Sequence, residues 1–285
     1  GKPEEIRPVA NITKMAIEVL IKYERQKLQS IRRQTKKERF IEMITSEDHA
    51  DPKGLRRLAE ELQYREDIIR IPILCCLEQP QYQKAFLESV KKGRLHKSED
   101  ISFALDEKYI LIFKTMDSTE KRMLAEYKYI LAEYLQGTLQ WMQREGIVCR
   151  FYIGTFQNSF LKYHYAYRHC RWLEKNTKSR HNSVYFYDHI CDYIQSIVPE
   201  DELDHIFNVY GKLLPEDMQN SCKELINTLV DTNFNTAKAS EALYMHKNTF
   251  LYQYNKIRDV LNVNPQSSYE DKWFLIFLQL FLKNK

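Results

Sequence analysis

The chain has 285 residues, 44% of them hydrophobic, and a formal net charge of +4. This length predicts two or three domains with ample core material. A net charge this close to zero does not by itself indicate a nucleic-acid partner. Only seven glycines are present and neither GxGxxG nor GxxxxGK(S/T) occurs, which argues against a glycine-rich phosphate-binding loop.

The first residues of the chain and its cysteines indicate in which cellular compartment the protein is expected. Residues 1–5 lack the apolar core of a signal peptide, and no apolar run is as long as a membrane span. The six cysteines show neither CxxC nor the spacing of a disulfide framework. We therefore expect a reduced, cytoplasmic protein without a membrane partner. Because Gly1 stands in place of methionine, we expect that an upstream domain is missing.

The N-terminal part is predicted to begin with one long helix over residues 6–36. Its apolar stripe recurs at helical spacing and consists of Ile12, Ala16, Val19 and Tyr23. The charged stretch 26–38 indicates that the helix projects from the body. A two-chain coiled coil and packing onto its own domain are both open.

A second N-terminal helix is predicted to start at Asp51-Pro52, a good N-cap and N1 pair, and to bury Leu55, Leu58 and Leu62. We assign residues 1–65 to a helical linker or dimerisation segment.

Over residues 66–214 the spacing of the hydrophobic residues is no longer only helical, and strand patterns appear as well. The expected strands are residues 69–77, 101–104, 109–115, 147–153 and 184–187, of which the second and third form a hairpin closed by residues 105–108. The expected helices are residues 118–144 and 161–175, followed by others near 190–198 and 202–214. This order predicts an α+β sandwich with a mainly antiparallel sheet and helices on its faces.

From Pro215 onward every predicted element is a helix. The first has a core face of Cys222, Leu225, Ile226 and Leu229. Asn235 caps a second helix over residues 236–244, a third covers 248–261, and a fourth covers 269–282. We expect residues 215–285 to be a separate four-helix domain with a helix-turn-helix at its centre.

The polar side chains of the third helix indicate what this domain binds. Its apolar residues share one face, which leaves Thr249, Tyr252, Gln253 and Lys256 projecting outward, with Lys247 and Asn248 at its N-terminus. Lysine neutralises phosphate, asparagine and glutamine can pair with adenine edges, and threonine can touch a thymine methyl. A helix N-terminus also favours phosphate. A helical bundle whose polar face is merely solvated is the alternative.

Residues 242–257 carry a resemblance to a known family, and they read ALYMHKNTFLYQYNKI. This string resembles the C-terminal helix-turn-helix of the purine-catabolism and sugar-diacid (PucR/CdaR-type) bacterial transcriptional regulators. The resemblance implies that the recognition helix is opened by His246, Lys247, Asn248 and Thr249, with Tyr252 one turn further. Lys247, Gln253 and Asn255 stand where that family has basic residues, mostly arginine, which puts the target sequence in doubt rather than the mode of binding.

The middle region resembles the same family's degenerate GGDEF-like domain, which is nucleotide-cyclase-like and has a ferredoxin-like sandwich. Residues 151–154 and 163–166 carry this likeness. A working cyclase needs two glycines on the hairpin, where this chain has Ala104 and Leu105 before Asp106 and Glu107. We therefore expect no enzyme and no catalytic, cofactor-binding or metal-binding residues.

Three weaker candidates, His164, His169 and Cys170, lie on one predicted helix, but their spacing does not place them on a shared face, so a metal site is not expected.

The sequence therefore predicts a dimeric, sequence-specific DNA-binding transcriptional regulator. Its expected partners are double-stranded DNA, a second copy of the chain and a small-molecule effector acting through the missing N-terminal domain. A non-DNA-binding interaction module with a nucleotide-binding cyclase-like domain is the alternative, and an active cyclase is a weaker rival.

Overall fold

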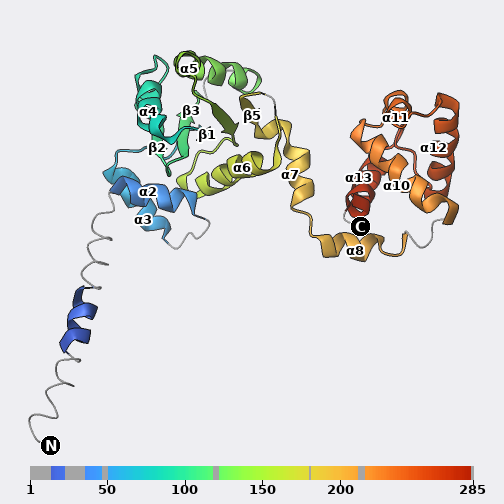
Figure 1. The fold of residues 1–285 in the computed structure, drawn as a ribbon, viewed down its shortest axis with the longest axis horizontal. Helices are drawn as coiled ribbons and strands as arrows, with labels where there is room; N and C mark the ends of the chain where they lie inside the picture. Colours follow the sequence, from blue (N-terminus) through green and yellow to red (C-terminus); the bar gives the residue numbers. More distant parts are fainter. Residues whose placement is uncertain are drawn as a thin grey trace, which may run out of the picture. The chain divides into compact units, whose positions relative to one another are not determined.

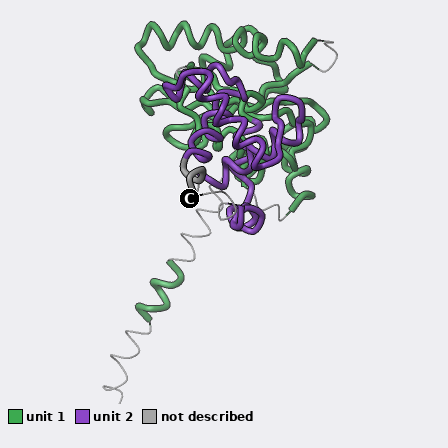
Figure 2. Tube along the Cα trace, turned by 90° about the vertical axis from the view of Figure 1, so that its right-hand side faces the viewer, with its two compact units in different colours: residues 1–189 green, residues 190–285 purple. Residues whose placement is uncertain are grey.

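The structure is a computed structural model that describes residues 14–22, 36–46, 51–117, 122–179, 181–210 and 216–283. It divides into two compact units, Gly1–His189 and Ile190–Lys285, which Figure 2 distinguishes by colour. Among the described residues, no helix combines the length and the apolarity needed to cross a bilayer.

The first unit is built on a five-stranded sheet of order β2-β3-β1-β4-β5. The strands are β1 Arg70–Leu77, β2 Ile101–Ala104, β3 Tyr109–Thr115, β4 Cys149–Ile153 and β5 Ser183–Tyr185. Only β4 and β5 are parallel; the other neighbouring pairs are antiparallel. A sheet in which β1 lies between β3 and β4, with crossover helices after β1 and β3, is the ferredoxin-like arrangement. The predicted α+β sandwich is confirmed.

The hairpin between β2 and β3 closes as predicted, at residues 105–108. One carboxylate oxygen of Asp106 accepts hydrogen bonds from the backbone N–H groups of Lys108 (2.8 Å) and Tyr109 (2.9 Å). Such a side-chain bond to the following backbone is the usual way in which aspartate stabilises a turn. Asp106 therefore has a structural role at this position.

Helices cover both faces of the sheet (Figure 1). One face carries α4 Gln83–Lys92 and α5 Met123–Glu145, whose apolar residues share a core with alternate residues of β1, such as Ile71 and Ile73. The opposite face carries α6 Tyr163–Asn176, and α2 Lys36–Thr45 contacts α6. Alternate strand residues point to opposite faces, which is why β1, buried over its whole length, serves both layers.

The remaining elements of this unit are short. They are α3 Pro52–Glu61, η1 Pro80–Tyr82, η2 Phe160–Lys162 and η3 Phe186–Asp188. Asp51 caps α3 as predicted, because its carboxylate accepts from the Gly54 backbone N–H at 2.8 Å. Leu55 and Leu58 are buried, whereas Leu62 is half-buried.

Part of the predicted N-terminal helix is described. Residues 14–22 are helical and exposed throughout, including Ala16 and Val19 of the predicted stripe. Ile12 and Tyr23, the other two stripe residues, lie outside the described residues. The coiled coil and the assignment of residues 1–65 to dimerisation therefore stay predictions.

The second unit is helical, as predicted. Its helices are α7 Ile190–Ser196, α8 Glu200–Phe207, α10 Glu216–Asp231, α11 Thr236–Ala242, α12 Lys247–Leu261 and α13 Tyr269–Lys283. Cys222, Leu225, Ile226 and Leu229 are all buried in its core. Leu203 and Phe207 of α8 join that core, so the compact unit starts before Pro215. The division into domains 1–65, 66–214 and 215–285 stays a prediction.

Candidate nucleic-acid interface

The centre of the second unit is the pair α11 and α12, joined by a tight turn. Asn235 caps α11, since its side chain accepts from the Lys238 N–H at 3.0 Å, as predicted. At the other end, the N–H groups of Tyr244 and Met245 donate to the carbonyls of Glu241 (3.0 Å) and Ser240 (2.9 Å). These two bonds form a Schellman motif, which ends α11 and turns the chain sharply toward α12.

Tyr244 occupies the left-handed position of this motif, with φ of +52°. Glycine is usual there because a side chain in this conformation meets its own backbone. The Tyr244 side chain is also 98% exposed and so gains nothing from packing within the chain. A bulky aromatic residue that has a disfavoured backbone conformation and is exposed to solvent is a candidate for contact with a binding partner. The sequence predictions did not single it out.

The second helix of the pair, α12, begins at Lys247. His246 is its N-cap, and Nδ1 of the imidazole accepts a hydrogen bond from the Asn248 N–H at 3.4 Å. An imidazole nitrogen accepts such a bond only when it carries no proton. The Thr249 N–H donates to the His246 carbonyl at 2.9 Å, which tightens the first turn of the helix.

The inner face of α12 fixes the helix to the unit. Phe250, Tyr254 and Ile257 are buried, and they pack in one core with residues of α10 and α13. The rings of Phe250 and Tyr254 are stacked with centroids 6.4 Å apart. Because these residues recur at helical spacing, the intervening residues are turned outward.

The outer face of α12 carries most of the predicted DNA-binding residues. His246, Lys247, Asn248, Thr249, Tyr252 and Lys256 are exposed, while Gln253 is half-buried. Tyr252 is 72% exposed, a large value for an aromatic side chain. The first two turns of α12 thus present amide, hydroxyl and ammonium groups to solvent.

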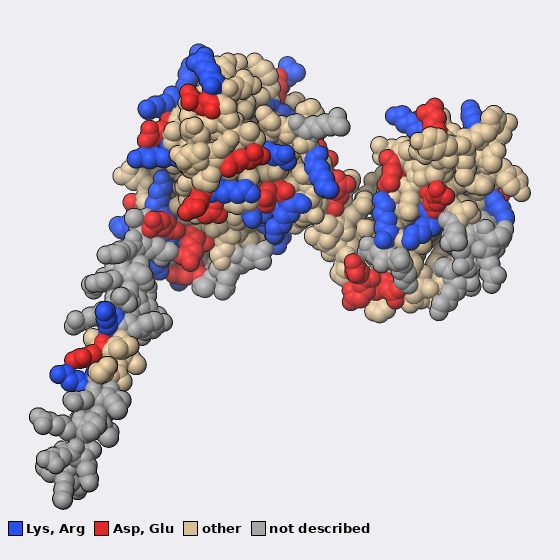
Figure 3. Space-filling view, in the orientation of Figure 1, with Lys and Arg blue, Asp and Glu red and all other residues tan. Residues whose placement is uncertain are grey.

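The charge on this unit is modest. Arg258 near the end of α12 forms an ion pair with Asp259 at 3.1 Å, so part of its charge is neutralised within the helix. On the face shown in Figure 3, basic and acidic side chains are interspersed over the second unit. Electrostatic attraction to phosphate by a single copy is therefore expected to be weak.

The histidines and cysteine of α6 contribute to packing. His164 and Cys170 are buried. His169 lies with Nδ1 3.1 Å from Thr155 Oγ1, and its ring stacks on Phe186 at 4.1 Å. Desolvation lowers the pKa of His169 to about 4, which keeps the ring neutral near pH 7. The described residues include no group of three or more His, Cys, Asp or Glu side chains placed to hold a metal ion.

Comparison with known proteins assigns the helix pair to a domain family. Residues 223–280 match the PucR C-terminal helix-turn-helix domain, so the second unit contains a helix-turn-helix of the PucR type. This match covers α11, the turn and α12 in full. No curated protein sequence matches the chain.

Among solved structures, the chain is similar to a regulator of polyketide synthase expression from Bifidobacterium adolescentis. The two are 11% identical, the match covers 88% of this chain and 93% of that chain, and the TM-score is 0.42.

Proposed function

We propose that this protein is a sequence-specific transcriptional regulator that binds double-stranded DNA in the cytoplasm through the N-terminal turns of α12. The observation that carries the proposal is the division of α12 into two faces. Phe250, Tyr254 and Ile257 hold the helix in the unit, while the start of the PucR-type recognition helix is exposed. A helix presented in this way fits the major groove.

The side chains of α12 suggest how the contact is divided. Asn248 and Thr249 are suited to read base edges, with Tyr252 and Gln253 one turn further along. Lys247 and Lys256 are suited to phosphates, as are His246 and the positive dipole end at the N-terminus of α12. No arginine lies in the first two turns, so guanine reading by a guanidinium fork is not expected.

A single copy should bind weakly, because acidic side chains are interspersed with the basic ones over the face of the unit that Figure 3 shows. Two copies on a pseudo-palindromic site would place one α12 in each of two half-sites about one DNA turn apart. We therefore propose a homodimer, paired through residues 1–65 or through the sheet-containing unit. The proposal assigns no catalytic step to the hairpin acids Asp106 and Glu107.

The test is replacement of both Asn248 and Thr249 by alanine. The bound oligonucleotides are first selected in vitro with the unaltered chain, and their affinity is then measured by fluorescence anisotropy. We expect the double variant to lose at least about 10-fold in specific affinity, since one good base contact contributes about 1–3 kcal/mol. Val260→Ala is the matched control, because Val260 is exposed further along the same helix.

Unchanged affinity of the double variant, with an unchanged circular-dichroism spectrum, would contradict the proposed contact. Failure of the selection to enrich any sequence would contradict sequence-specific binding and favour the interaction-module alternative. The salt dependence separates these cases further, because phosphate contacts make affinity fall steeply as salt rises.

A further inference from the structure

The first unit contains a cavity of about 630 Å³ between α4 and α5. The two helices run antiparallel. Oγ of Ser89 lies 3.4 Å from Oγ1 of Thr138, whereas Nδ1 of His96, beyond the end of α4, lies 2.9 Å from the hydroxyl oxygen of Tyr134, one turn earlier on α5. Both lie on the same face of the sheet (Figure 1). A cavity of this volume falls within the range of sites that hold small metabolites.

One wall of the cavity is an aromatic slot on α5. A Cβ atom added to Gly137 would meet nothing within 4 Å, so the slot is open at that point. Tyr134 and Trp141 lie three residues before and four residues after Gly137, and all three line the cavity. Residues at this spacing share one helix face. A planar ring resting on Gly137 would therefore lie between Trp141 and the exposed margin of Tyr134, whose side chain is 6% exposed and stacks on the His96 ring at a centroid distance of 6.2 Å.

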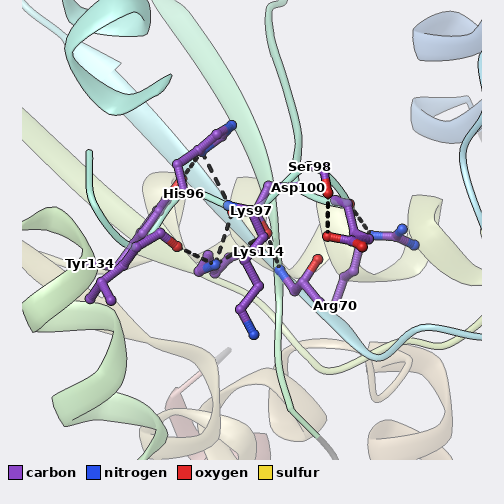
Figure 4. A network of polar contacts seen from close by, with 10 residues as sticks. Arg70, His96, Lys97, Ser98, Asp100, Lys114 and Tyr134 are labelled. Carbon is purple, nitrogen blue, oxygen red and sulfur yellow. Dashed lines mark hydrogen bonds and ion pairs between the residues drawn. The ribbon is translucent and has the colours of Figure 1, made fainter. Parts of the chain in front are cut away.

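The opposite wall is held in place by a buried polar network (Figure 4). Nζ of Lys114, which comes from β3, donates to the Leu95 carbonyl at 2.9 Å and to the Asp100 carboxylate at 2.9 Å. The same ammonium lies 4.8 Å from the centre of the Tyr134 ring. Leu95 and Tyr134 both line the cavity, so this network fixes parts of two walls before any ligand arrives.

The network has little freedom to rearrange. Lys114 is 3% exposed and Asp100 is 7% exposed, and the Thr115 N–H also donates to Asp100 at 2.7 Å. Breaking a buried pair of this kind leaves an uncompensated charge, which is costly.

The rim of the cavity carries charges of both signs. Lys92 and Arg94 lie at and just after the end of α4, Glu88 lies one turn earlier, and Glu133 lies on α5. Within the part of the chain that the structure describes, none of these four side chains forms an ion pair. A ligand with only one kind of charge would meet groups that repel it as well as groups that attract it.

We propose that this cavity binds a small metabolite with a planar aromatic or heteroaromatic ring that carries both an anionic group and an amino group. The ring lies over Gly137 between Tyr134 and Trp141. The anionic group faces Lys92 and Arg94, and the amino group faces a rim carboxylate. Because the cavity lies within the first unit, the proposal does not depend on DNA binding.

The experiment is isothermal titration calorimetry of the full chain with three probes that share one ring. L-Tryptophan carries both charges, indole-3-propionate carries only the anionic group, and tryptamine carries only the cationic group. Each is titrated to about 5 mM, which detects dissociation constants up to the millimolar range. We expect L-tryptophan to bind at least about 10-fold more tightly than either of the others, a difference of about 1.4 kcal/mol.

Two sets of variants locate the binding. Gly137→Leu fills the slot and should abolish L-tryptophan binding, while Ala132→Leu, on an exposed position of α5 outside the cavity, should leave it unchanged. Both substitutions suit a helix, so the fold is retained and circular dichroism verifies it. Replacing Lys92 and Arg94 with glutamine should weaken L-tryptophan and indole-3-propionate but not tryptamine.

The proposal is overturned if none of the three probes binds the unaltered chain, or if Gly137→Leu binds L-tryptophan as the unaltered chain does. Equal affinity for all three probes would overturn the requirement for two charged groups.

Discussion

Tyr244 adopts a backbone conformation that lowers the stability of the fold. Its φ of +52° places a side chain where glycine is favoured, and its exposure of 98% means that no packing within the unit offsets the cost. The residue lies in the turn before α12, where an aromatic ring with a hydroxyl could reach the DNA backbone beside the groove.

We predict that Tyr244→Gly has opposite effects on stability and on DNA binding. The free energy of unfolding should rise by about 0.5–1 kcal/mol, because glycine adopts the left-handed conformation without a clash. Affinity for the selected DNA should fall several-fold, because a contact is lost. Urea unfolding and fluorescence anisotropy measure the two effects.

Asn233 provides the matched control for Tyr244. It has φ of +53° and occupies the equivalent position after α10, where the Phe234 N–H donates to the Leu229 carbonyl at 2.7 Å. Asn233→Gly should leave DNA affinity unchanged. If Tyr244→Gly also leaves DNA affinity unchanged, the side chain has no role in binding.

At the scale of elements, two glycines show how closely a helix can approach its neighbours. Gly154 follows β4, and a Cβ atom there would lie 2.5 Å from the Ala166 carbonyl oxygen and 2.9 Å from Cys170 Sγ, both on α6. The absence of a side chain at Gly154 therefore lets α6 pack against the sheet. Gly137, in the middle of α5, has open space instead.

We predict that alanine has opposite effects at these two positions. Gly154→Ala should lower the free energy of unfolding by about 1–3 kcal/mol, because the packed backbone of α6 must shift. Gly137→Ala should raise it by up to about 1 kcal/mol, because alanine favours the helix and meets no neighbour. Urea unfolding compares both variants with the unaltered chain, and equal effects would contradict the packing described for α6.

Elements whose signals are local could be predicted from the sequence. The hairpin of β2 and β3 has a run of turn residues between two apolar segments, and α12 has apolar residues at regular helical spacing. The caps Asp51 and Asn235 were predicted for the same reason, since an N-cap acts on the backbone within three residues.

Features that depend on distant residues could not be predicted. Arg70 lies in an apolar run, yet it is fully buried because its guanidinium donates to the Glu99 carbonyl and to the Tyr163 hydroxyl, 29 and 93 residues away. Lys114 is likewise buried through contacts with residues that are distant in the sequence. The cavity beside it forms only where α4 meets α5. The half-burial of Gln253 likewise depends on packing that helical spacing alone does not show.

For the whole molecule, the two units have cores of their own. The core under α4 and α5 consists of residues from the first unit, and the core around α12 consists of residues from the second. The second core includes Leu203 and Phe207, so a fragment that begins at Pro215 would lack part of it. Residues 190–285 are therefore the fragment expected to fold cooperatively by itself.

We predict that the 190–285 fragment binds the selected DNA more weakly than the full chain and with a shallower dependence on salt. The logarithm of the binding constant falls with the logarithm of salt concentration, and the slope is proportional to the number of phosphates neutralised. If the proposed pairing through the preceding residues is right, the full chain contacts two half-sites and its slope should be about twice that of the fragment. Mobility shifts at several salt concentrations give both slopes. Equal slopes would mean that one copy binds alone, and the proposed dimer would then be wrong even if DNA recognition by α12 is right.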